Sequence, residues 1–276
     1  MKRVLVTGAA GRIGRAVLDL LGQQGITANA LVLEDPGDLK AELVVAGSAT
    51  DSHAVRKALK GADAVIHLAA IPTPERHPAE EVFAANTQAT FTVLEQAGRA
   101  GIRQVCTASS TAISGLPFAA RTLHPRYAPV DEEQPSLSED PYALSKQVDE
   151  LTAQMMSRRH RMSVTALRLP YVGGFDERLL DFAGRCELDP GLHAAGLWAY
   201  LETRDAARAC LLGLALGGCH VITVAAPETL VSHPTEDLLR HFHPTTEIRR
   251  PLPGRTVPLN LTRATGVLGF SAEFHV

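Results

Sequence analysis

Three glycines at intervals of three, Gly8, Gly11 and Gly14, stand between a short apolar run and an amphipathic stretch. Residues 3–7 have the pattern of a buried strand, and residues 12–24 repeat apolar positions at helical spacing. Between a strand and a helix, the first glycine permits a tight turn, the second lets backbone N–H groups approach a pyrophosphate, and the third permits close packing. The helix N-terminus adds unpaired donors and a positive dipole end. The pattern predicts a dinucleotide-binding turn, whose other members are Ala10, Arg12 and Ile13.

Strand-like and helix-like stretches alternate along most of the chain. Strands are expected at 3–7, 28–33, 41–46, 63–68, 104–108, 163–168 and 220–224, and helices at 12–24, 51–60, 80–100 and 141–159. Such alternation is typical of parallel sheets built from βα units. The expected fold class is therefore α/β, a Rossmann-type doubly wound parallel sheet with a small C-terminal substrate-binding lobe.

The domain boundaries follow from where this alternation weakens. We assign residues 1–174 plus 198–226 to the dinucleotide-binding domain, and 175–197 plus 227–276 to the substrate-binding lobe. Residues 116–140 are rich in proline and acidic side chains and are expected to form a surface loop.

Composition excludes several classes of function. The 276 residues carry 27 Lys+Arg against 30 Asp+Glu, a balance that provides no electrostatic footprint for nucleic acid or anionic membrane. The first apolar run is too short for a signal peptide, and no run approaches the length of a membrane span, so a cytoplasmic location is predicted. The cysteines lack paired or metal-ligand spacing and are expected to be buried thiols; they are Cys106, Cys186, Cys210 and Cys219. No metal site is predicted.

The acidic pair Glu34-Asp35 follows the second expected strand, about twenty residues beyond Gly14. A carboxylate there accepts hydrogen bonds from the adenosine ribose and repels a 2′-phosphate, which favours NAD over NADP. The pattern leaves open which of the two acids acts, because a solvated turn before Pro36 explains one of them. Arg12 is the residue of the glycine turn that could reach a 2′-phosphate instead.

Tyr142 and Lys146 lie four residues apart at the start of an expected helix, so both side chains lie on one helix face. A nearby ammonium favours the phenolate form of a tyrosine, which can accept a hydroxyl proton while hydride leaves the same carbon. Ser109 and Ser110 follow the fifth expected strand, at the sheet edge where ligands bind. These residues predict a catalytic trio of Ser110, Tyr142 and Lys146.

Together, these motifs resemble the extended short-chain dehydrogenase/reductases, and among them the NAD-dependent epimerase/dehydratase family. The resemblance rests on the glycine turn, His67-Leu-Ala-Ala70, Asn86, Ser109-Ser110 and Tyr142-x-x-x-Lys146, and covers most of residues 1–225. It implies Tyr142 as general base or acid, Lys146 as the ligand of the nicotinamide ribose, and Ser110 as the group that polarises the substrate oxygen. The remaining residues that it implies at the cofactor are Ser48, Leu68, Ala69, Ala70, Asn86, Ser109 and Pro170.

The substrate is less sharply indicated. Thr111-Ala112 stands where dehydratases of the family place Asp-Glu, which argues against a 4,6-dehydratase. About two dozen residues separate Gly174 from Trp198, a segment that is short for binding a nucleotide. The chain's length is similar to that of small sugar-acid dehydrogenases of the family, such as uronate dehydrogenases. Arginines can hold a carboxylate in bidentate geometry. The candidates in the substrate half are Arg168, Arg178, Arg185 and Arg204.

The sequence thus predicts an NAD-dependent oxidoreductase that acts on a secondary alcohol or hemiacetal of a small sugar or sugar acid. Two alternatives stay open: a sugar epimerase that retains its NAD, and a non-catalytic dinucleotide sensor. The intact Tyr142 and Lys146 count against the sensor. The resemblance also implies a possible homodimer, formed through the helices around 86–100 and 142–158.

Overall fold

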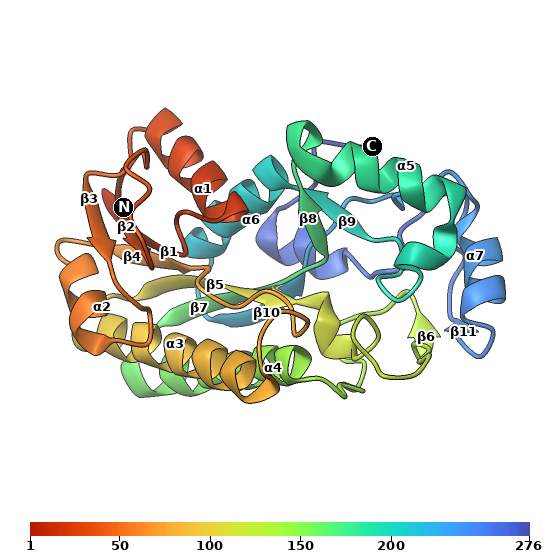
Figure 1. Ribbon diagram of the computed structural model, residues 1–276, viewed down its shortest axis with the longest axis horizontal. Coiled ribbons are helices and arrows are strands. Elements are labelled where there is room, and N and C mark those ends of the chain that lie inside the picture. Colours follow the sequence, from red (N-terminus) through yellow and green to blue (C-terminus); the bar gives the residue numbers. More distant parts are fainter.

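Seven parallel strands form the central sheet of this computed structural model, which describes residues 1–276 (Figure 1). In spatial order they are β10 (Cys219–Thr223), β7 (Ser163–Leu169), β5 (Gln104–Ser110), β4 (Ala64–His67), β1 (Arg3–Thr7), β2 (Thr27–Val32) and β3 (Leu43–Ala46). The strand order reverses between β1 and β4, which is the switch point of a doubly wound sheet. The predicted Rossmann-type α/β fold is confirmed.

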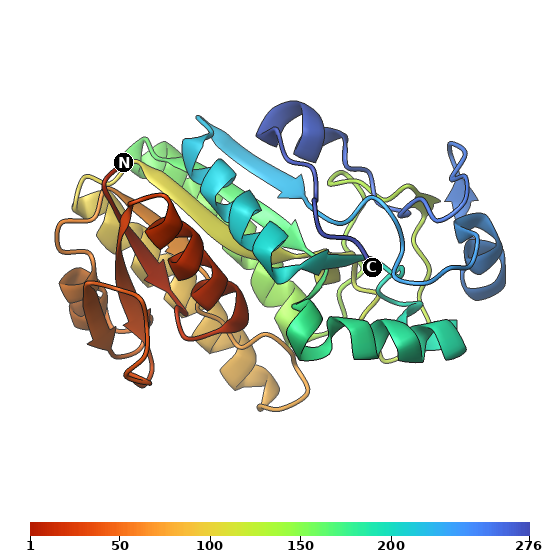
Figure 2. The ribbon, with the colours of Figure 1, turned by 90° about the horizontal axis from the view of Figure 1, so that it is seen from above.

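Helices cover both faces of the sheet (Figures 1 and 2). One face carries α1 (Arg12–Gln23) and α6 (Thr203–Ala215), and the other carries α2 (Ser52–Ala58), α3 (Ala79–Arg99) and α4 (Pro141–His160). The side chains of β1 alternate between the two faces of the sheet: Val4 and Val6 pack with α1, and Leu5 packs on the opposite side. Burial on both faces explains why the strands are almost continuously apolar.

Beyond the carboxyl ends of the strands lies a lobe with its own core. Its elements are β6 (Tyr127–Ala128), β8 (Tyr171–Gly173), α5 (Leu180–Leu188), β9 (Tyr200–Glu202), α7 (Thr235–Phe242) and β11 (Glu247–Ile248), with short helical turns at Phe175–Leu179 and Pro190–His193. Two further turns lie outside the lobe core: Thr111–Ser114 packs against α4, and Ala264–Leu268 packs against α6 and β10. β8 pairs with β9, and β6 pairs with β11. Trp198 and Tyr200 are fully buried in this core, which therefore has a large aromatic centre.

The expectation of a surface loop at 116–140 is wrong. Leu116, Ala128 and Val130 are buried in the lobe core, and β6 pairs with β11 from a distant part of the chain. The prolines and acidic residues of this segment prevent long regular elements, but they do not prevent the apolar residues between them from being buried.

Three cysteines, Cys106, Cys186 and Cys210, are buried as predicted, whereas Cys219 is exposed. Cys219 is the first residue of β10, and β10 is an edge strand of the sheet, so no neighbouring strand covers it on that side. None of the helices combines the length and apolar character that a membrane crossing requires.

Glu95 joins α3 to the end of α4. Its side chain is only 7% exposed and accepts hydrogen bonds from His160 Nε2 (2.7 Å), Arg99 Nε (2.8 Å) and Arg159 Nε (3.2 Å). The hydrogen bond from His160, followed by those from the two arginines, lowers the pKa of Glu95 to about 2.

We expect Glu95→Gln to lower the free energy of unfolding at pH 7 by about 1–3 kcal/mol, because it weakens hydrogen bonds to a charged acceptor. The folded pKa of Glu95 lies below the ordinary value of 4.5, so its stabilisation is complete above that value and is lost as the pH falls toward 2. Urea unfolding from pH 7 to pH 3 measures the difference. Glu81→Gln, which removes an exposed carboxylate from the same helix, is the control and should cost less than about 0.5 kcal/mol. If the difference in unfolding free energy between the wild-type protein and Glu95→Gln did not decrease with falling pH, this account would be contradicted.

Candidate functional site

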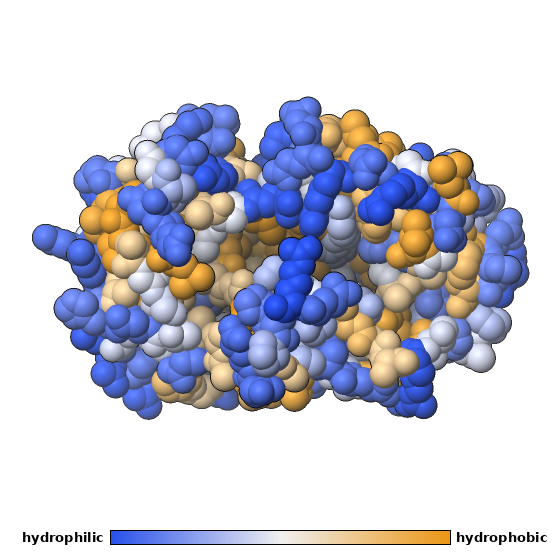
Figure 3. Space-filling view, viewed as in Figure 1, coloured by the Kyte–Doolittle hydropathy of each residue, from blue (hydrophilic) through white to orange (hydrophobic).

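A cleft of about 800 Å³ runs along the carboxyl ends of the strands, between the sheet and the lobe. Figure 3 shows this face hollowed near its centre, with hydrophobic residues inside the hollow and hydrophilic residues across its mouth. The cleft includes the switch point between β1 and β4, where ligands bind in doubly wound sheets. Every residue that the sequence predicted at the cofactor or in catalysis lines it, except Asp35: Gly8, Ala10, Gly11, Arg12, Ile13, Gly14, Glu34, Ser48, Leu68, Ala69, Ala70, Asn86, Ser109, Ser110, Tyr142, Lys146 and Pro170.

The glycine turn connects β1 to α1 without any side chain at its tightest points. Gly8 has a φ of +66°, and a Cβ there would stand 2.8 Å from the backbone nitrogen of Ala69. A Cβ on Gly14 would stand 2.4 Å from the Gly8 carbonyl oxygen. The glycines therefore let α1 begin directly against the turn, so that its N-terminal N–H groups face the cleft.

Glu34 and Asp35, the acidic pair, lie in two different environments. Glu34 lines the cleft beyond the end of β2, whereas Asp35 Oδ1 accepts a hydrogen bond from Gly37 N at 2.9 Å and supports the next turn. Ser48 also lines the cleft, and its hydroxyl lies 2.7 Å from that of Thr50. Of the two acids, only Glu34 is placed to meet a ligand in the cleft.

A buried hydroxyl connects the ends of β1 and β4. Thr7 Oγ1 accepts hydrogen bonds from Leu68 N and Ala69 N, both at 3.2 Å, and lies 2.7 Å from His67 Nδ1. Burial lowers the pKa of His67 to about 3, so the ring is neutral: Nδ1 accepts from Thr7, and Nε2 donates to Thr90 Oγ1 at 3.2 Å. Sequence reasoning missed Thr7, whose only signal is its position before Gly8.

Asn86 holds the segment that follows β4. Its Oδ1 accepts from Ile71 N at 2.7 Å, and its Nδ2 donates to Ile71 O at 3.1 Å and to Ser145 Oγ at 3.0 Å. The side chain is buried and binds both a cleft-lining backbone and α4. Its direct contacts therefore give Asn86 a positioning role at the cleft wall.

The start of α4 presents Tyr142 and Lys146 to the cleft. Asp140 caps this helix by accepting from Ala143 N at 2.8 Å. Lys146 Nζ lies 6.0 Å from the centre of the Tyr142 ring and donates to Ala108 O (3.0 Å) and Asp149 Oδ2 (3.3 Å). Burial raises the pKa of Asp149, and the neighbouring ammonium opposes that effect. The ammonium is thus fixed between β5 and its own helix, one turn from the phenol.

The two serines at the end of β5 have different partners. Ser110 Oγ accepts from Ala112 N at 3.1 Å and lines the cleft. Ser109 Oγ donates to Glu150 Oε1 at 2.6 Å, and Arg168 binds both oxygens of that carboxylate, at 2.9 and 2.8 Å. Arg168 is therefore engaged with Glu150, and it does not line the main cleft.

Of the four candidate arginines, only Arg178 lines the cleft. Its guanidinium lies 4.6 Å from the centre of the Tyr171 ring and donates to Val172 O at 3.1 Å. Tyr171 in turn stacks on Phe182. Sequence reasoning missed several residues of this lobe-side wall, because they come from segments without periodic pattern: Pro117, Phe118, Tyr171, Val172, Leu192, His193, Ala195 and Gly196.

An ion pair joins the glycine turn to the lobe. Arg12 Nε contacts Glu177 Oε2, and Glu177 belongs to the helical turn Phe175–Leu179 that also carries Arg178. Both side chains are partly exposed, so the pair is screened by solvent and contributes little to stability. Its effect is geometric, because it connects the two walls of the cleft.

Comparison with known proteins finds a matching family and several relatives. Residues 4–186 match the family described as the NAD dependent epimerase/dehydratase family. An L-arabinose 1-dehydrogenase (NAD(P)(+)) of Haloferax volcanii is 30% identical over 182 residues, which is 64% of this chain and 70% of the relative. A uronate dehydrogenase of Pseudomonas syringae pv. tomato is 27% identical over 172 residues, 60% of this chain and 58% of the relative.

Solved structures extend the likeness to nearly the whole chain. A short-chain dehydrogenase/reductase superfamily protein from Agrobacterium tumefaciens, solved with bound NAD, has a TM-score of 0.73 and 25% identity. The alignment covers 99% of this chain and 93% of that one. The lobe is therefore included in the shared architecture.

We expect Gly14→Ala to destabilise the protein by about 1–3 kcal/mol, the scale of overpacking, because its Cβ would clash with the backbone of Gly8 and Ala9. Gly22→Ala on the same helix is the matched control, since a Cβ there meets nothing within 4 Å and should stabilise by about 0.4–1 kcal/mol. Urea unfolding of both variants measures the difference. Equal effects of the two substitutions would show that the turn does not need a glycine at this position.

Proposed function

The chain belongs to the NAD dependent epimerase/dehydratase family, and on that premise we propose that it is an NAD-dependent oxidoreductase of a small sugar or sugar-acid-like substrate. The reaction transfers hydride between the nicotinamide and a secondary alcohol or hemiacetal carbon. The observation that carries the proposal is the meeting, in one cleft, of the glycine turn with Ser110, Tyr142 and Lys146. The sugar dehydrogenases among its relatives support the same reaction class.

The residues of the cleft fit a dinucleotide. The side-chain-free cradle at Gly8 and Gly14, in front of the N-terminus of α1, suits a pyrophosphate. Glu34 at the end of β2 suits the adenosine ribose, and Lys146 suits the nicotinamide ribose. NAD, when bound, supplies the acceptor for the hydride.

Each residue of the trio has a separate role in the proposed reaction. Tyr142 accepts the proton of the substrate hydroxyl during oxidation and returns it during reduction. Lys146 Nζ is held by Ala108 O and Asp149 Oδ2, which keeps its positive charge one helical turn from the phenol. Ser110 donates a hydrogen bond to the substrate oxygen and so keeps it beside the phenol. Phe118 packs edge-on against the Tyr142 ring and restricts its orientation.

An NAD-retaining sugar epimerase would use the same three residues, since the family includes such enzymes. We favour the dehydrogenase because the match spans 70% of the L-arabinose 1-dehydrogenase but only 50% of a UDP-glucose 4-epimerase that is also among the relatives. Release of NADH with turnover is diagnostic of the dehydrogenase, and tightly retained NAD without net redox change is diagnostic of the epimerase. A dinucleotide sensor requires neither Tyr142 nor Lys146.

The oligomer that we propose is a homodimer formed through α3 and α4. Their outer surface carries large exposed apolar side chains: Phe91 is 46% exposed, Leu144 45% and Leu151 57%. Leu144 and Leu151 are two helical turns apart and therefore share a face of α4. A second copy placed on this surface would cover all three.

For the cofactor, we expect NAD to raise the midpoint of thermal unfolding of the wild-type protein and NADP to leave it unchanged. Glu34→Gln should reduce the preference for NAD about tenfold or more, because it removes the charge that binds the ribose and repels a 2′-phosphate. Asp35→Asn is the matched control and should keep the preference, since Asp35 supports the turn at Gly37. If only Asp35→Asn lost the preference for NAD over NADP, Asp35 rather than Glu34 would be the residue that binds the adenosine ribose.

For catalysis, we expect Tyr142→Phe to lower kcat by about 10²–10⁴-fold, the range for loss of a general acid–base group. NADH release at 340 nm from a panel of aldoses and uronic acids measures the rate. The NAD-induced rise in the unfolding midpoint should stay, because the phenol oxygen is not needed to fold the cleft. Tyr200→Phe removes a buried phenol oxygen that contacts Val276 N and serves as the control. Undiminished turnover by Tyr142→Phe would refute the assignment.

A further inference from the structure

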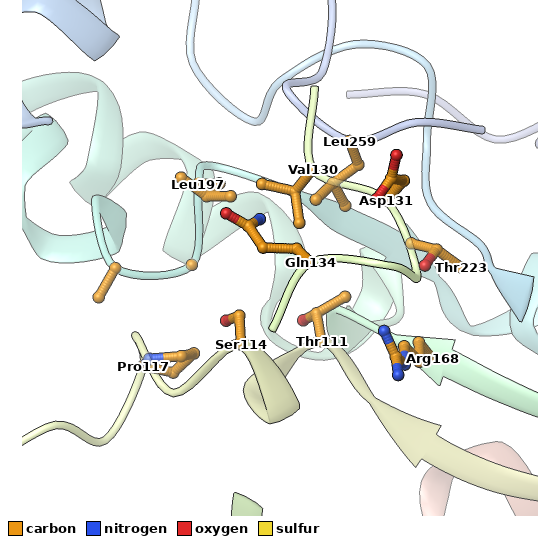
Figure 4. A pocket seen from close by; sticks show the side chains of 12 residues that line it. Thr111, Ser114, Pro117, Val130, Asp131, Gln134, Arg168, Leu197, Thr223 and Leu259 are labelled. Atoms are coloured by element: carbon orange, nitrogen blue, oxygen red, sulfur yellow. The ribbon is translucent and has the colours of Figure 1, made fainter. Parts of the chain in front are cut away.

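A second, smaller cavity lies beside the cleft and shares part of its lining (Figure 4). We name it the side pocket; its lining residues are Thr111, Ser114, Pro117, Val130, Asp131, Gln134, Arg168, Ala195, Gly196, Leu197, Thr223 and Leu259. Thr111, Pro117, Ala195 and Gly196 line both the side pocket and the cleft. Its volume of about 30 Å³ has room for about two water molecules, so it can take a group of two or three heavy atoms but no sugar ring.

Gln134 offers this pocket a hydrogen-bond donor that has no partner. Its Oε1 accepts from Arg126 N (2.6 Å) and Tyr127 N (3.4 Å), which fixes the orientation of the amide. The residue is 9% exposed, and its Nε2 is buried without a hydrogen-bond partner. Figure 4 shows the amide end among the lining residues, extended away from its own backbone. A buried amide without an acceptor is unfavourable, so an oxygen that enters the pocket gains a hydrogen bond there.

The charges around the pocket favour a neutral group over an anion. Arg168 donates from Nε and Nη2 to Glu150 and from Nη1 to Glu132 O, so its charge is already balanced by a carboxylate. Asp131 adds a further carboxylate to the lining, with its Oδ1 accepting from Tyr127 OH at 2.7 Å. A substrate carboxylate would be buried beside it without a free cation, which is costly. A hydroxyl both donates and accepts, and so suits a lining that offers an amide N–H and carboxylate oxygens.

We propose that the side pocket binds the exocyclic hydroxymethyl group of a neutral sugar, with Gln134 Nε2 as donor to its oxygen. The proposal rests on the proposed function and narrows its substrate class to neutral aldoses. One carbon and one oxygen match the size of the pocket, and the ring stays in the cleft. Thr111, which lines both the pocket and the cleft, directly follows Ser110, so the pocket lies next to the residue assigned to the reacting oxygen.

The test compares sugars that differ only in the group offered to the pocket. D-galactose, D-fucose and L-arabinose share a ring configuration and carry CH2OH, CH3 and H at that position; D-glucose, 6-deoxy-D-glucose and D-xylose form the second series. Binding to NAD-loaded Tyr142→Phe protein is followed by the fluorescence of Trp198, the only tryptophan, which adjoins Leu197 of the pocket. NADH release by the Tyr142-containing protein is measured in parallel. In the better-bound series, we expect the hydroxymethyl sugar to bind about tenfold more tightly than its deoxy analogue, the scale of one hydrogen bond.

Two variants examine the pocket itself. Gln134→Met removes the donor without adding a charge beside Asp131, so the tenfold preference should disappear. It also removes the acceptor of Arg126 N and Tyr127 N, and unaltered binding of the pentose shows that the rest of the site is retained. Ser114→Val fills the pocket without touching Gln134, and should weaken the six-carbon sugars while sparing the pentose. Gln104→Met, at the opposite end of β5, makes the same chemical change far from the cleft and should leave the ratio of the binding constants of hydroxymethyl and deoxy sugars unchanged.

Each outcome has a definite meaning. Tighter binding and faster NADH release with the hydroxymethyl sugar than with its deoxy analogue support both the pocket assignment and the proposed reaction. Tighter binding of the hydroxymethyl sugar without NADH release from any sugar supports the pocket assignment and overturns the proposed dehydrogenase. Equal binding of hydroxymethyl and deoxy sugars, an unchanged preference in Gln134→Met, or no sugar binding at all overturns the assignment of the pocket.

Discussion

The buried hydroxyl of Thr7 ties together the two strands between which the sheet reverses its order, and the floor of the cleft depends on this connection. It accepts the N–H group of Ala69, shares the N–H group of Leu68 with the Thr7 carbonyl oxygen, and donates to the neutral ring of His67. Leaving the Ala69 N–H group unpaired would cost about 1–3 kcal/mol. Because Gly8 has no Cβ, its backbone can approach Ala69 at this point. The phosphate turn and the segment after β4 therefore form one rigid unit.

The helix α4 supplies the other half of the site. Tyr142, Lys146 and Glu150 follow one another at intervals of four, so they lie along one helix face. The first two face the cleft, while Glu150 binds Ser109 and Arg168 and thereby fastens the helix to β5 and β7. The same contacts hold the end of β5, which carries Ser110. The spacing between serine and tyrosine is thus set by a buried carboxylate that lies outside the trio.

Prediction from the sequence succeeded where the signal is local. Each strand of the central sheet was expected within two residues of its observed ends, because its apolar run is bounded by turn residues. It failed in the lobe, whose strands have only two or three residues and are too short to show a period. The segment 116–140 was expected at the surface, yet Ala128 is fully buried through a pairing of β6 with a strand far along the chain. Composition cannot reveal such a partner.

By itself, the sequence determined the sheet, the glycine turn and the common face of Tyr142 and Lys146, because each depends on neighbours within a few residues. Only the tertiary structure decided that Glu34 rather than Asp35 faces the cleft, that Arg168 is bound to Glu150 while Arg178 is free to line the wall, and that Gln134 keeps an unpaired donor. These facts depend on which distant side chains pack together. The fold decides which polar side chains reach the cleft with a donor or acceptor left unused, and no local pattern contains that information.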